Sequence, residues 1–526
     1  MAETDFILLW GSNARETHPI LFHHLLKAVR RGAKLAVIDP RRSASAQFAH
    51  VWLGLDVGSD ISLANAMARE IIHAGLANEK FIQHAASGFA AYRETVERYT
   101  LERAEQETGV PARLVRETAH AYAKADRAQL CWTLGITEHH NAVDNVLALI
   151  NLALLTGHVG RYGSGINPLR GQNNVQGGGD MGAIPDRFPG FQHVENAELR
   201  GKFEKAWGVK IDPQRGWHVT GMFEAMEREE LTTLYVLGEN PVSSEADGHH
   251  ARKLLGDLEF LIVQDLFYTE TAQMADVVLP AAAGWCESEG TVTNSERRVQ
   301  RVRAAAAPPA GVMDDTAILY ELARRLGHEW GEPRAEAIWD ELRGLSPMHS
   351  GMSYARLEEF GGIQWPCYDE SHPGEQYLHS RLWQEPLIGP RAPFFCVEFE
   401  PPVDRLTPEF PIRLTTGRRL DSYNTGVQTG KYSSPLRRPE TLDLSPEDGA
   451  RYALQEGERV RIRSRRGAVE APVNFDRGLR QGLAFMTLHF PDQVRTNDLT
   501  IEAPDPKSGT SEFKATAIAI EKLGEK

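Results

Sequence analysis

The chain has 526 residues, too many for one hydrophobic core, and this length predicts roughly three or four domains. With 41% hydrophobic and 25% charged residues, it has the composition of an ordinary soluble globular protein. Its net charge of −14 argues against a general nucleic-acid-binding surface, because phosphate binding needs clustered lysine and arginine.

The cysteines and the apolar runs indicate the compartment. The four cysteines are scattered, and no pair has the C-x2-C spacing of a zinc or iron–sulfur site, which favours a reducing environment. No apolar run is long enough to span a bilayer, and the stretch Phe6–Trp10 is too short for a signal peptide. We therefore expect a cytoplasmic protein without direct membrane insertion.

The first part of the chain has the pattern of a βαβ unit. Phe6–Trp10 and Leu35–Ile38 are apolar runs typical of buried parallel strands, and residues 18–31 between them have helical periodicity. An acidic residue, Asp39, ends the second strand, where dinucleotide-binding folds often bind a ribose. The glycine fingerprint GxGxxG is absent, however, which makes an unrelated NAD-dependent Rossmann enzyme a poor alternative. The α/β pattern continues through a strand at residues 130–135 and a helix at 145–155.

A second α/β section and a β-rich end follow. Strands are predicted at residues 234–238, 260–263 and 275–280. We expect polar residues at all three successive strand ends, where open α/β sheets bind ligands. After Pro411 the pattern changes to short strands, at 412–416, 459–464, 468–474 and 483–490, which indicates a β-barrel. We therefore predict two Rossmann-like doubly wound α/β domains, over residues 1–172 and 173–400, followed by a barrel over 401–526.

The most informative stretch is the loop Leu169–Gly182. It places Arg170 among side-chain amides and then runs into three consecutive glycines. Amides both donate and accept hydrogen bonds, glycine allows close approach of the backbone to a ligand, and arginine binds carboxylates or phosphates with two parallel hydrogen bonds. Such a loop suits a large polar cofactor with a small anion beside it.

Taken together, the motifs resemble the molybdopterin oxidoreductase family, and within it the catalytic subunits of molybdenum- or tungsten-dependent formate dehydrogenases. The resemblance covers essentially the whole chain. Its most specific segments are Gly135–His139, Leu154–Gly157, Asn167–Gly177, Gly238–Pro241, Val263–Asp265, Ala275–Pro280, Glu289–Gln300 and Thr415–Arg418.

The resemblance implies a molybdenum or tungsten ion held by two molybdopterin guanine dinucleotides, and a C-terminal barrel of the double-psi type. It implies three sets of cofactor-binding residues. One nucleotide end would be held by Gly11, Asn13, Asp39, Arg41, Gly58 and Asp60. The other would be held by Gly238, Asn240, Gln264, Asp265, Thr271 and Asp276. Gly135, Gln172, Gly417, Arg418, Thr425 and Asn497 would lie nearer the pterins.

Arg170 carries the expected catalytic role. Formate dehydrogenases resemble this chain in having Arg-Gly-Gln-Asn-Asn, whereas related nitrate reductases have Thr before Gly-Gln-Pro-Asn. A guanidinium beside the metal would anchor the formate carboxylate in a reactive pose. A structural salt bridge or a contact with a cofactor phosphate is the alternative role for Arg170. His139 and His140, which lie near the same strand end, are interpreted as structural.

The chain departs from the family pattern at its front. The domain with four cysteines for a [4Fe–4S] cluster is absent, as are the metal-ligating cysteine or selenocysteine and its neighbouring histidine. Asn424 also stands where relatives often have histidine. We expect this chain to be the C-terminal part of a catalytic subunit and to be inactive without the missing part. We also expect an exposed sheet edge and apolar surface in the second α/β section.

The expected partners are formate and an N-terminal half or an iron–sulfur or flavin electron-transfer subunit, with no nucleic acid. Two other functions stay open. One is a non-catalytic cofactor-binding remnant or scaffold subunit, which would purify without metal. The other is a molybdenum reductase for nitrate or a related oxyanion, against which Arg170 argues.

Overall fold

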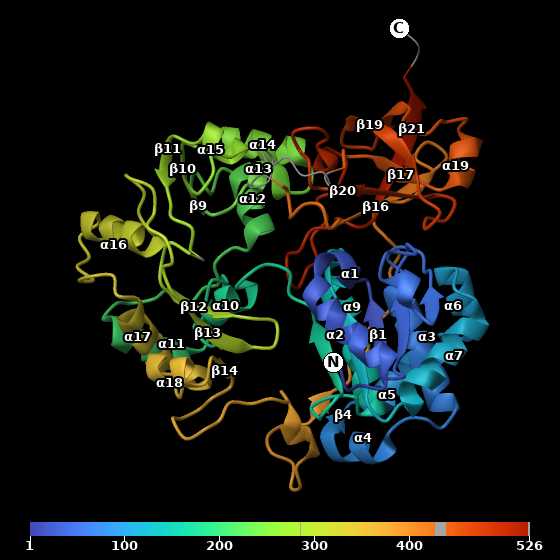
Figure 1. Cartoon of the computed structure of the whole chain (residues 1–526), viewed down its shortest axis with the longest axis horizontal. Coiled ribbons are helices and arrows are strands. Elements are labelled where there is room, and N and C mark those ends of the chain that lie inside the picture. Colours follow the sequence, from blue (N-terminus) through green and yellow to red (C-terminus); the bar gives the residue numbers. More distant parts are fainter. Residues whose placement is uncertain (285, 427–437, 524–526) are drawn as a thin grey trace. The chain divides into compact units, whose positions relative to one another are not determined.

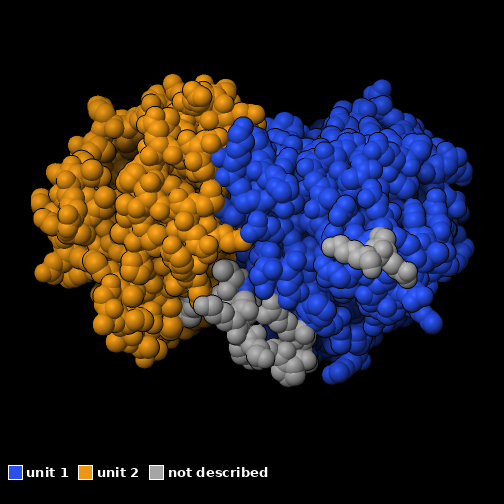
Figure 2. All heavy atoms as spheres, turned by 90° about the horizontal axis from the view of Figure 1, so that it is seen from above, with its two compact units in different colours: residues 1–169, 241–253, 377–526 blue, residues 170–240, 254–376 orange. Residues whose placement is uncertain are grey.

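The computed structural model describes residues 1–284, 286–426 and 438–523, and Figure 1 traces its elements along the chain. By its internal contacts the chain forms two compact units, coloured separately in Figure 2. Unit 1 holds residues 1–169, 241–253 and 377–526, and unit 2 holds residues 170–240 and 254–376. The barrel thus belongs to the same unit as the first α/β section, and the division differs from the three consecutive domains predicted above.

A five-stranded parallel sheet forms the centre of the first α/β section. Its order is β3-β2-β1-β5-β6, the order of a doubly wound sheet. The strands are β1 (Phe6–Trp10), β2 (Lys34–Ile38), β3 (Val51–Leu53), β5 (Ala128–Trp132) and β6 (Gly165–Pro168). Side chains of β1 alternate between two cores, with Leu8 and Trp10 in one and Ile7 and Leu9 in the other. Burial on both faces explains why β1 is apolar throughout.

Helices cover both faces of this sheet. Helix α2 contributes Phe22 and Leu25 to the core on the Ile7 face, whereas α3, α7 and α9 pack on the Leu8 face. The helices of this section are α1 (Ala14–Thr17), α2 (Pro19–Arg30), α3 (Asp60–His73), α4 (Glu79–Ala85), α5 (Phe89–Glu97), α6 (Leu101–Thr108), α7 (Ala112–Lys124), α8 (Leu134–Thr137) and α9 (Ala142–Thr156).

An irregular strap, residues 392–399, crosses this section. It pairs through β15 (Ala392–Pro393) with β4 (Ala86–Ser87). Asn151, buried on α9, donates to the Phe395 carbonyl at 2.8 Å and accepts from the Phe395 amide at 3.1 Å. Buried asparagine thus satisfies backbone groups of the strap that have no sheet partner.

The C-terminal section is a closed six-stranded barrel in the order β16-β20-β17-β19-β18-β21. Its interior is apolar, with Ile412, Leu414, Val460 and Ile518 buried. The elements are β16 (Ile412–Gly417), β17 (Leu442–Leu444), α19 (Pro446–Arg451), β18 (Arg459–Arg463), β19 (Ala468–Phe475), β20 (Leu483–Thr487) and β21 (Thr516–Lys522). Two helices from the middle of the chain, α13 (Pro241–Ser244) and the first part of α14 (Gly248–Gly256), also belong to unit 1.

Unit 2 contains a small parallel sheet in the order β11-β10-β9 and an antiparallel sheet in the order β12-β13-β14. Its strands are β7 (Arg187–Phe188), β8 (Gln192–His193), β9 (Thr233–Leu237), β10 (Phe260–Asp265), β11 (Val277–Pro280), β12 (Gly290–Thr293), β13 (Arg298–Val302) and β14 (Ile363–Gln364). Its helices are α10 (Val175–Asp180), α11 (Ala197–Trp207), α12 (Val219–Glu227), α15 (Glu270–Met274), α16 (Asp315–Arg325), α17 (Ala335–Leu345) and α18 (Tyr354–Glu359).

The parallel sheet of unit 2 is only partly covered. Leu261 and Val263 lie in a core on one face, whereas Leu237, Phe260 and Val277 are exposed. Among the described residues, β9 and β11 are its outer strands. The apolar surface expected from the sequence is therefore present on this sheet.

Several predicted element boundaries differ from the observed ones. The strand predicted for residues 130–135 ends at Trp132 because the chain turns into α8. The strand predicted to reach Phe490 ends at Thr487, whose amide donates to Glu440 rather than continuing a ladder. None of the helices in the described ranges combines the length and apolar character needed to cross a membrane.

Candidate functional site

Polar residues gather where β1 and β2 end side by side in unit 1. The Asn13 side-chain oxygen accepts from the Ser45 amide at 3.1 Å and the Ser45 hydroxyl at 3.0 Å. The Asp39 carboxylate accepts from the Arg41 amide at 2.9 Å, and burial raises the pKa of Asp39. The Arg41 guanidinium stacks on the ring of Phe485, 3.4 Å from its centroid. The structure thus places Asn13, Asp39 and Arg41 just after the ends of β1 and β2.

Gly11 and Gly135 lie back to back at the same strand ends. The Gly135 amide donates to the Gly11 carbonyl at 3.1 Å. Gly11 has a φ of +55°, and a Cβ on it would lie 2.8 Å from the Gly135 backbone. Both positions therefore require glycine, which leaves the backbone open to close approach by a bulky ligand.

Gly58 and Asp60, the other predicted residues of this set, precede and begin α3. Gly58 has a φ of +81°, and a Cβ there would lie 2.7 Å from Pro402. Asp60 is buried, accepts from the Trp10 indole at 2.8 Å, and has its pKa raised by burial. The carboxylate of Asp60 is therefore already bound by the protein.

The barrel brings Gly417 and Arg418 to this region of unit 1. A Cβ on Gly417 would lie 2.7 Å from Phe485 and 3.7 Å from the Arg41 guanidinium. Among the described residues, neither the buried Nη1 atom of Arg418 nor the buried Ser12 hydroxyl has a hydrogen-bond partner. A buried donor without an acceptor is costly, so both atoms are suited to a polar ligand.

The remaining barrel residues of the predicted pterin set are placed differently. Asn497 is buried and donates to the carbonyls of Ser243 and Ser244 at 3.0 and 3.1 Å, so its amide ties α13 to the barrel. Thr425 lies in a turn at the edge of the described residues. Asn424, where histidine was noted in relatives, has a positive φ of 43°.

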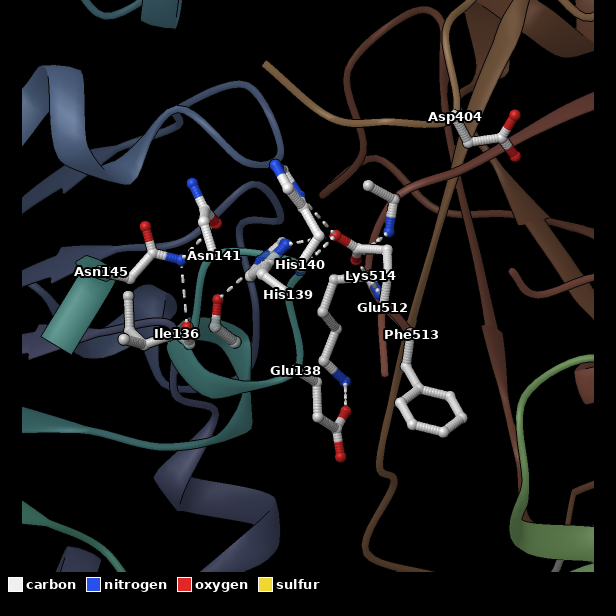
Figure 3. Close-up of polar contacts among 12 residues, drawn as sticks. Ile136, Glu138, His139, His140, Asn141, Asn145, Asp404, Glu512, Phe513 and Lys514 are labelled. Atoms are coloured by element: carbon white, nitrogen blue, oxygen red, sulfur yellow. Dashed lines mark hydrogen bonds and ion pairs between the residues drawn. The ribbon is translucent and has the colours of Figure 1, made fainter. Parts of the chain in front are cut away.

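A buried ionic cluster joins the first α/β section to the barrel (Figure 3). Glu512 is fully buried and accepts from His139 Nδ1 at 3.1 Å and from the His140 amide at 3.2 Å. The other carboxylate oxygen accepts from the backbone amide of Lys514 at 2.8 Å. The Lys514 Nζ lies 2.5 Å from the Glu138 carboxylate.

The contacts of His139 in this cluster favour the protonated imidazolium form. Its Nε2 lies 3.1 Å from the Gly135 carbonyl, which only accepts, and its Nδ1 faces the carboxylate. Burial lowers the pKa of His139, but the charge and hydrogen bond of Glu512 outweigh it and leave the pKa raised. For Glu512, burial raises the pKa, yet His139 and the other donors hold it far below its usual range.

In unit 2, a cleft of about 380 Å³ lies at the carboxyl ends of β9 and β10. It is lined by the predicted residues Gly238, Gln264 and Asp265 and by Asn173 and Asn174 of the glycine-rich loop. Gly238 has a φ of +65°, and its amide donates to the Gln264 carbonyl at 2.8 Å. Burial raises the pKa of Asp265. The position agrees with the rule that open α/β sheets bind ligands at strand carboxyl ends.

The other predicted residues of unit 2 hold this sheet together. The Asn240 side chain accepts from the Thr271 hydroxyl at 2.7 Å, and both residues are buried. The structure does not bring Asp276 to the cleft. Asp276 precedes β11 and accepts from the Leu261 amide at 2.8 Å, at the amino end of the sheet. The strand-end argument fails for Asp276 because it starts its strand rather than ending it.

Sequence reasoning missed three polar residues of the cleft, Glu289, Thr291 and Asp315. Asp315 begins α16 and accepts from the Gln264 amide at 2.5 Å. The pair Asp314-Asp315 before an apolar helix signals a helix start, and the Asp314 carboxylate does cap α16 by accepting from the Ala317 amide. No such local signal places these residues beside β9, because only the fold does so.

Arg170 lies in unit 2 on the loop before α10 and is exposed. Its Nε donates to the Gln176 side-chain oxygen at 3.1 Å. Gln172, on the same loop, is also exposed. Cys131, in contrast, is fully buried in β5, and burial raises the pKa of its thiol to about 12, so it is no thiolate ligand.

Comparison with known protein families identifies the family of this chain. A family model described as "Molybdopterin oxidoreductase" matches residues 1–325, and one described as "Molydopterin dinucleotide binding domain" matches residues 412–517. The chain belongs to the molybdopterin oxidoreductase family. The glycine contacts at Gly11 and Gly135, the unpaired Arg418 nitrogen and the cleft beside Gly238 fit a large phosphate-bearing cofactor of this family.

Individual relatives within the family differ in function. The chain is 38% identical to the F420-dependent formate dehydrogenase subunit alpha of Methanocaldococcus jannaschii, over 99% of this chain and 76% of the relative. It is 34% identical to the assimilatory nitrate reductase catalytic subunit of Bacillus subtilis, over 98% of this chain and 74% of the relative. Among solved structures, acetylene hydratase from Pelobacter acetylenicus matches with a TM-score of 0.74 and 20% identity, covering 99% of this chain and 78% of that one. The last match supports the fold alone.

Proposed function

We propose that this molybdopterin oxidoreductase is the catalytic subunit of a formate dehydrogenase, or a large part of one. The observation that carries the proposal is Arg170, which stands in the Arg-Gly-Gln-Asn-Asn loop whose Asn173 and Asn174 line the unit 2 cleft. Three relatives named as formate dehydrogenase alpha subunits are 37–39% identical to this chain, which supports the same substrate.

Two molybdopterin guanine dinucleotides would bind, one in each unit. The residues that would hold the first are Gly11, Asn13, Asp39 and Arg41, with Gly417 and Arg418 from the barrel. The second cofactor would be held by Gly238, Asp265 and Asp315. The carboxylates of Asp265 and Asp315 suit the N–H edge of guanine. When bound, the two cofactors and their molybdenum or tungsten ion supply two-electron redox chemistry.

Arg170 would bind the substrate. Formate is a small carboxylate, and a guanidinium is a permanently charged donor whose two parallel N–H groups match it. Fixing both oxygens orients the single C–H bond, which is the bond that must break. The four cysteines of this chain do not supply a metal ligand in the proposal. A thiolate or selenolate and an iron–sulfur cluster from another polypeptide segment would complete the active enzyme in the cytoplasm.

The test begins with the chain co-produced with a candidate iron–sulfur partner. We expect molybdenum or tungsten in the purified complex and about two GMP released per metal ion on acid hydrolysis. Arg170→Ala should reduce kcat/KM for formate at least about 100-fold, because it removes a charged contact with the substrate, while metal and GMP content stay unchanged. Unchanged formate turnover in that variant would reject the anchoring role.

The nitrate reductase relative makes a second substrate class worth testing. Turnover of nitrate, with none of formate, would assign the chain to that branch of the family instead. Absence of metal and GMP from a fully assembled complex would favour the scaffold alternative.

A further inference from the structure

Three side chains lead from the buried interior of unit 2 to Arg170. Gln176 and Asp180 stand four residues apart on α10 and therefore share one face of it. Arg170 Nε donates to Gln176 Oε1 at 3.1 Å, and Gln176 Nε2 donates to Asp180 Oδ1 at 2.8 Å. The indole nitrogen of Trp365 donates to the other oxygen of Asp180 at 2.8 Å.

The direction of each hydrogen bond from Trp365 through Asp180 and Gln176 to Arg170 is fixed. A guanidinium and an indole N–H only donate, and a carboxylate only accepts. The Gln176 amide must therefore turn its NH2 group toward Asp180, which leaves its oxygen facing Arg170. The negative charge of Asp180 thus determines that Arg170 meets an acceptor rather than a donor.

The carboxylate at the inner end of this hydrogen-bond network is buried, so it needs all of its donors. Asp180 is fully buried, Gln176 is partly exposed and Arg170 is exposed. Burial raises the pKa of Asp180. Hydrogen bonds from Gln176, Trp365 and Thr293, and the charge of Arg170, oppose that rise. The Asp180 backbone carbonyl also accepts from the Gly190 amide at 2.7 Å, so α10 is fixed at that end.

We propose that Gln176 and Asp180 are positioning residues that orient the guanidinium of Arg170. With Nε bound to Gln176, the terminal Nη1 and Nη2 groups form the edge that meets a small carboxylate. The orientation of Arg170 is inferred from the hydrogen bonds above. The identity of its ligand as formate depends on the proposed formate dehydrogenase function.

Two isosteric substitutions test the polarity argument. In Asp180→Asn, the side-chain oxygen must accept from Trp365, so its NH2 group faces Gln176 and turns the Gln176 NH2 toward Arg170. The Arg170 hydrogen bond is then lost without a change in shape. In the double variant Gln176→Glu/Asp180→Asn, the carboxylate at position 176 accepts from both neighbours, and all the bonds are restored.

The first measurement is the water-exchange rate of the Arg170 Nε–H in the 15N-labelled full chain, with its signal assigned by Arg170→Lys. We expect Asp180→Asn to speed exchange about fivefold, the equivalent of one hydrogen bond, and the double variant to return it to the wild-type rate. If Asp180→Asn does not fold, Gln176→Ala, which leaves the buried carboxylate in place, should give the same acceleration. Unchanged exchange in both single variants, or no recovery in the double variant, would overturn the proposal.

A matched control lies on the exposed face of α16. Arg324 Nε donates to the Glu321 carboxylate at 2.8 Å, so Glu321→Gln should alter the Arg324 signal and leave Arg170 unchanged. The second measurement is KM for formate in the assembled enzyme, which should rise in Asp180→Asn and recover in the double variant. Altered Nε–H exchange with unchanged formate kinetics would keep the positioning role and reject formate as the ligand of Arg170.

Discussion

At the scale of single residues, Glu512 organises donors from two sections of unit 1. Its carboxylate accepts from His139 and His140 of the first α/β section and from backbone amides beside the last barrel strand. Paired buried charges replace lost hydration only when all their partners are present. The cluster in Figure 3 therefore fixes the barrel against α8, the short helix that carries Gly135.

Removing this carboxylate should be strongly destabilising. We expect Glu512→Gln to lower the free energy of unfolding by about 3–5 kcal/mol, because the charge of His139 stays buried without its partner. Urea unfolding of the full chain measures the loss. As a control, Glu321→Gln removes the exposed ion pairs with Arg324 and Arg325 and should leave the urea midpoint of unfolding almost unchanged.

The same pair predicts the pH dependence of stability. The pKa of His139 is raised above the ordinary histidine value of 6.5. The contribution of His139 to stability is therefore complete below that pH and is lost as the pH rises through the folded-state pKa. The pKa of Glu512 is lowered from 4.5, so its contribution is present above that pH and is lost only in stronger acid. Unfolding of the wild type should therefore become easier on raising the pH above neutrality. The double variant His139→Gln/Glu512→Gln should show a flatter profile.

At the scale of elements, the contact between the ends of β1 and β5 depends on two glycines. Gly11→Ala should destabilise unit 1 by about 2–4 kcal/mol, because it adds left-handed strain to a clash with Gly135. Gly75→Ala is the matched control. It has a similar φ of +66° and open space around it, so only the strain of about 1–2 kcal/mol remains. Equal losses in thermal unfolding would show that the contact is unimportant.

Elements with strong local patterns could be predicted from the sequence, and those stabilised by distant partners could not. The runs at β1 and β2 could be recognised because buried parallel strands are apolar almost throughout, and β9 and β10 because each holds an apolar run of strand length. Strands β17 and β21 were missed. β17 has three residues, and its pairing with β19 and β20 is visible only in the closed barrel.

In the candidate site, too, residues with a local sequence signal could be predicted and those placed only by the fold could not. Gly238 and Asp265 follow strand ends, where open α/β sheets bind ligands, and Arg170 stands in a recognisable motif. Asp276, which the resemblance implied, instead precedes its strand. Asp315 and Glu289 join the cleft only through tertiary structure. The Gln176–Asp180 pair has helical spacing, but its polarity depends on Trp365, which is distant in sequence.

At the scale of the whole molecule, two compact units built from interleaved segments should unfold as separate cooperative blocks. Calorimetry of the full chain should then show two transitions. Glu512→Gln should lower only the one that belongs to unit 1. Asp314→Ala, which removes the N-cap of α16, should lower only the other, by about 1 kcal/mol in free energy. A single transition that both variants shift equally would contradict this expectation.

The position of β21 in the barrel has a consequence for biosynthesis. β21 pairs with both β16 and β18 and so closes the ring, although it is translated after the other five barrel strands. While the ribosome is still translating, β16 and β18 therefore expose unpaired edges, which attract other chains. Premature termination before Thr516 would leave the nascent polypeptide as a substrate for chaperones and proteases.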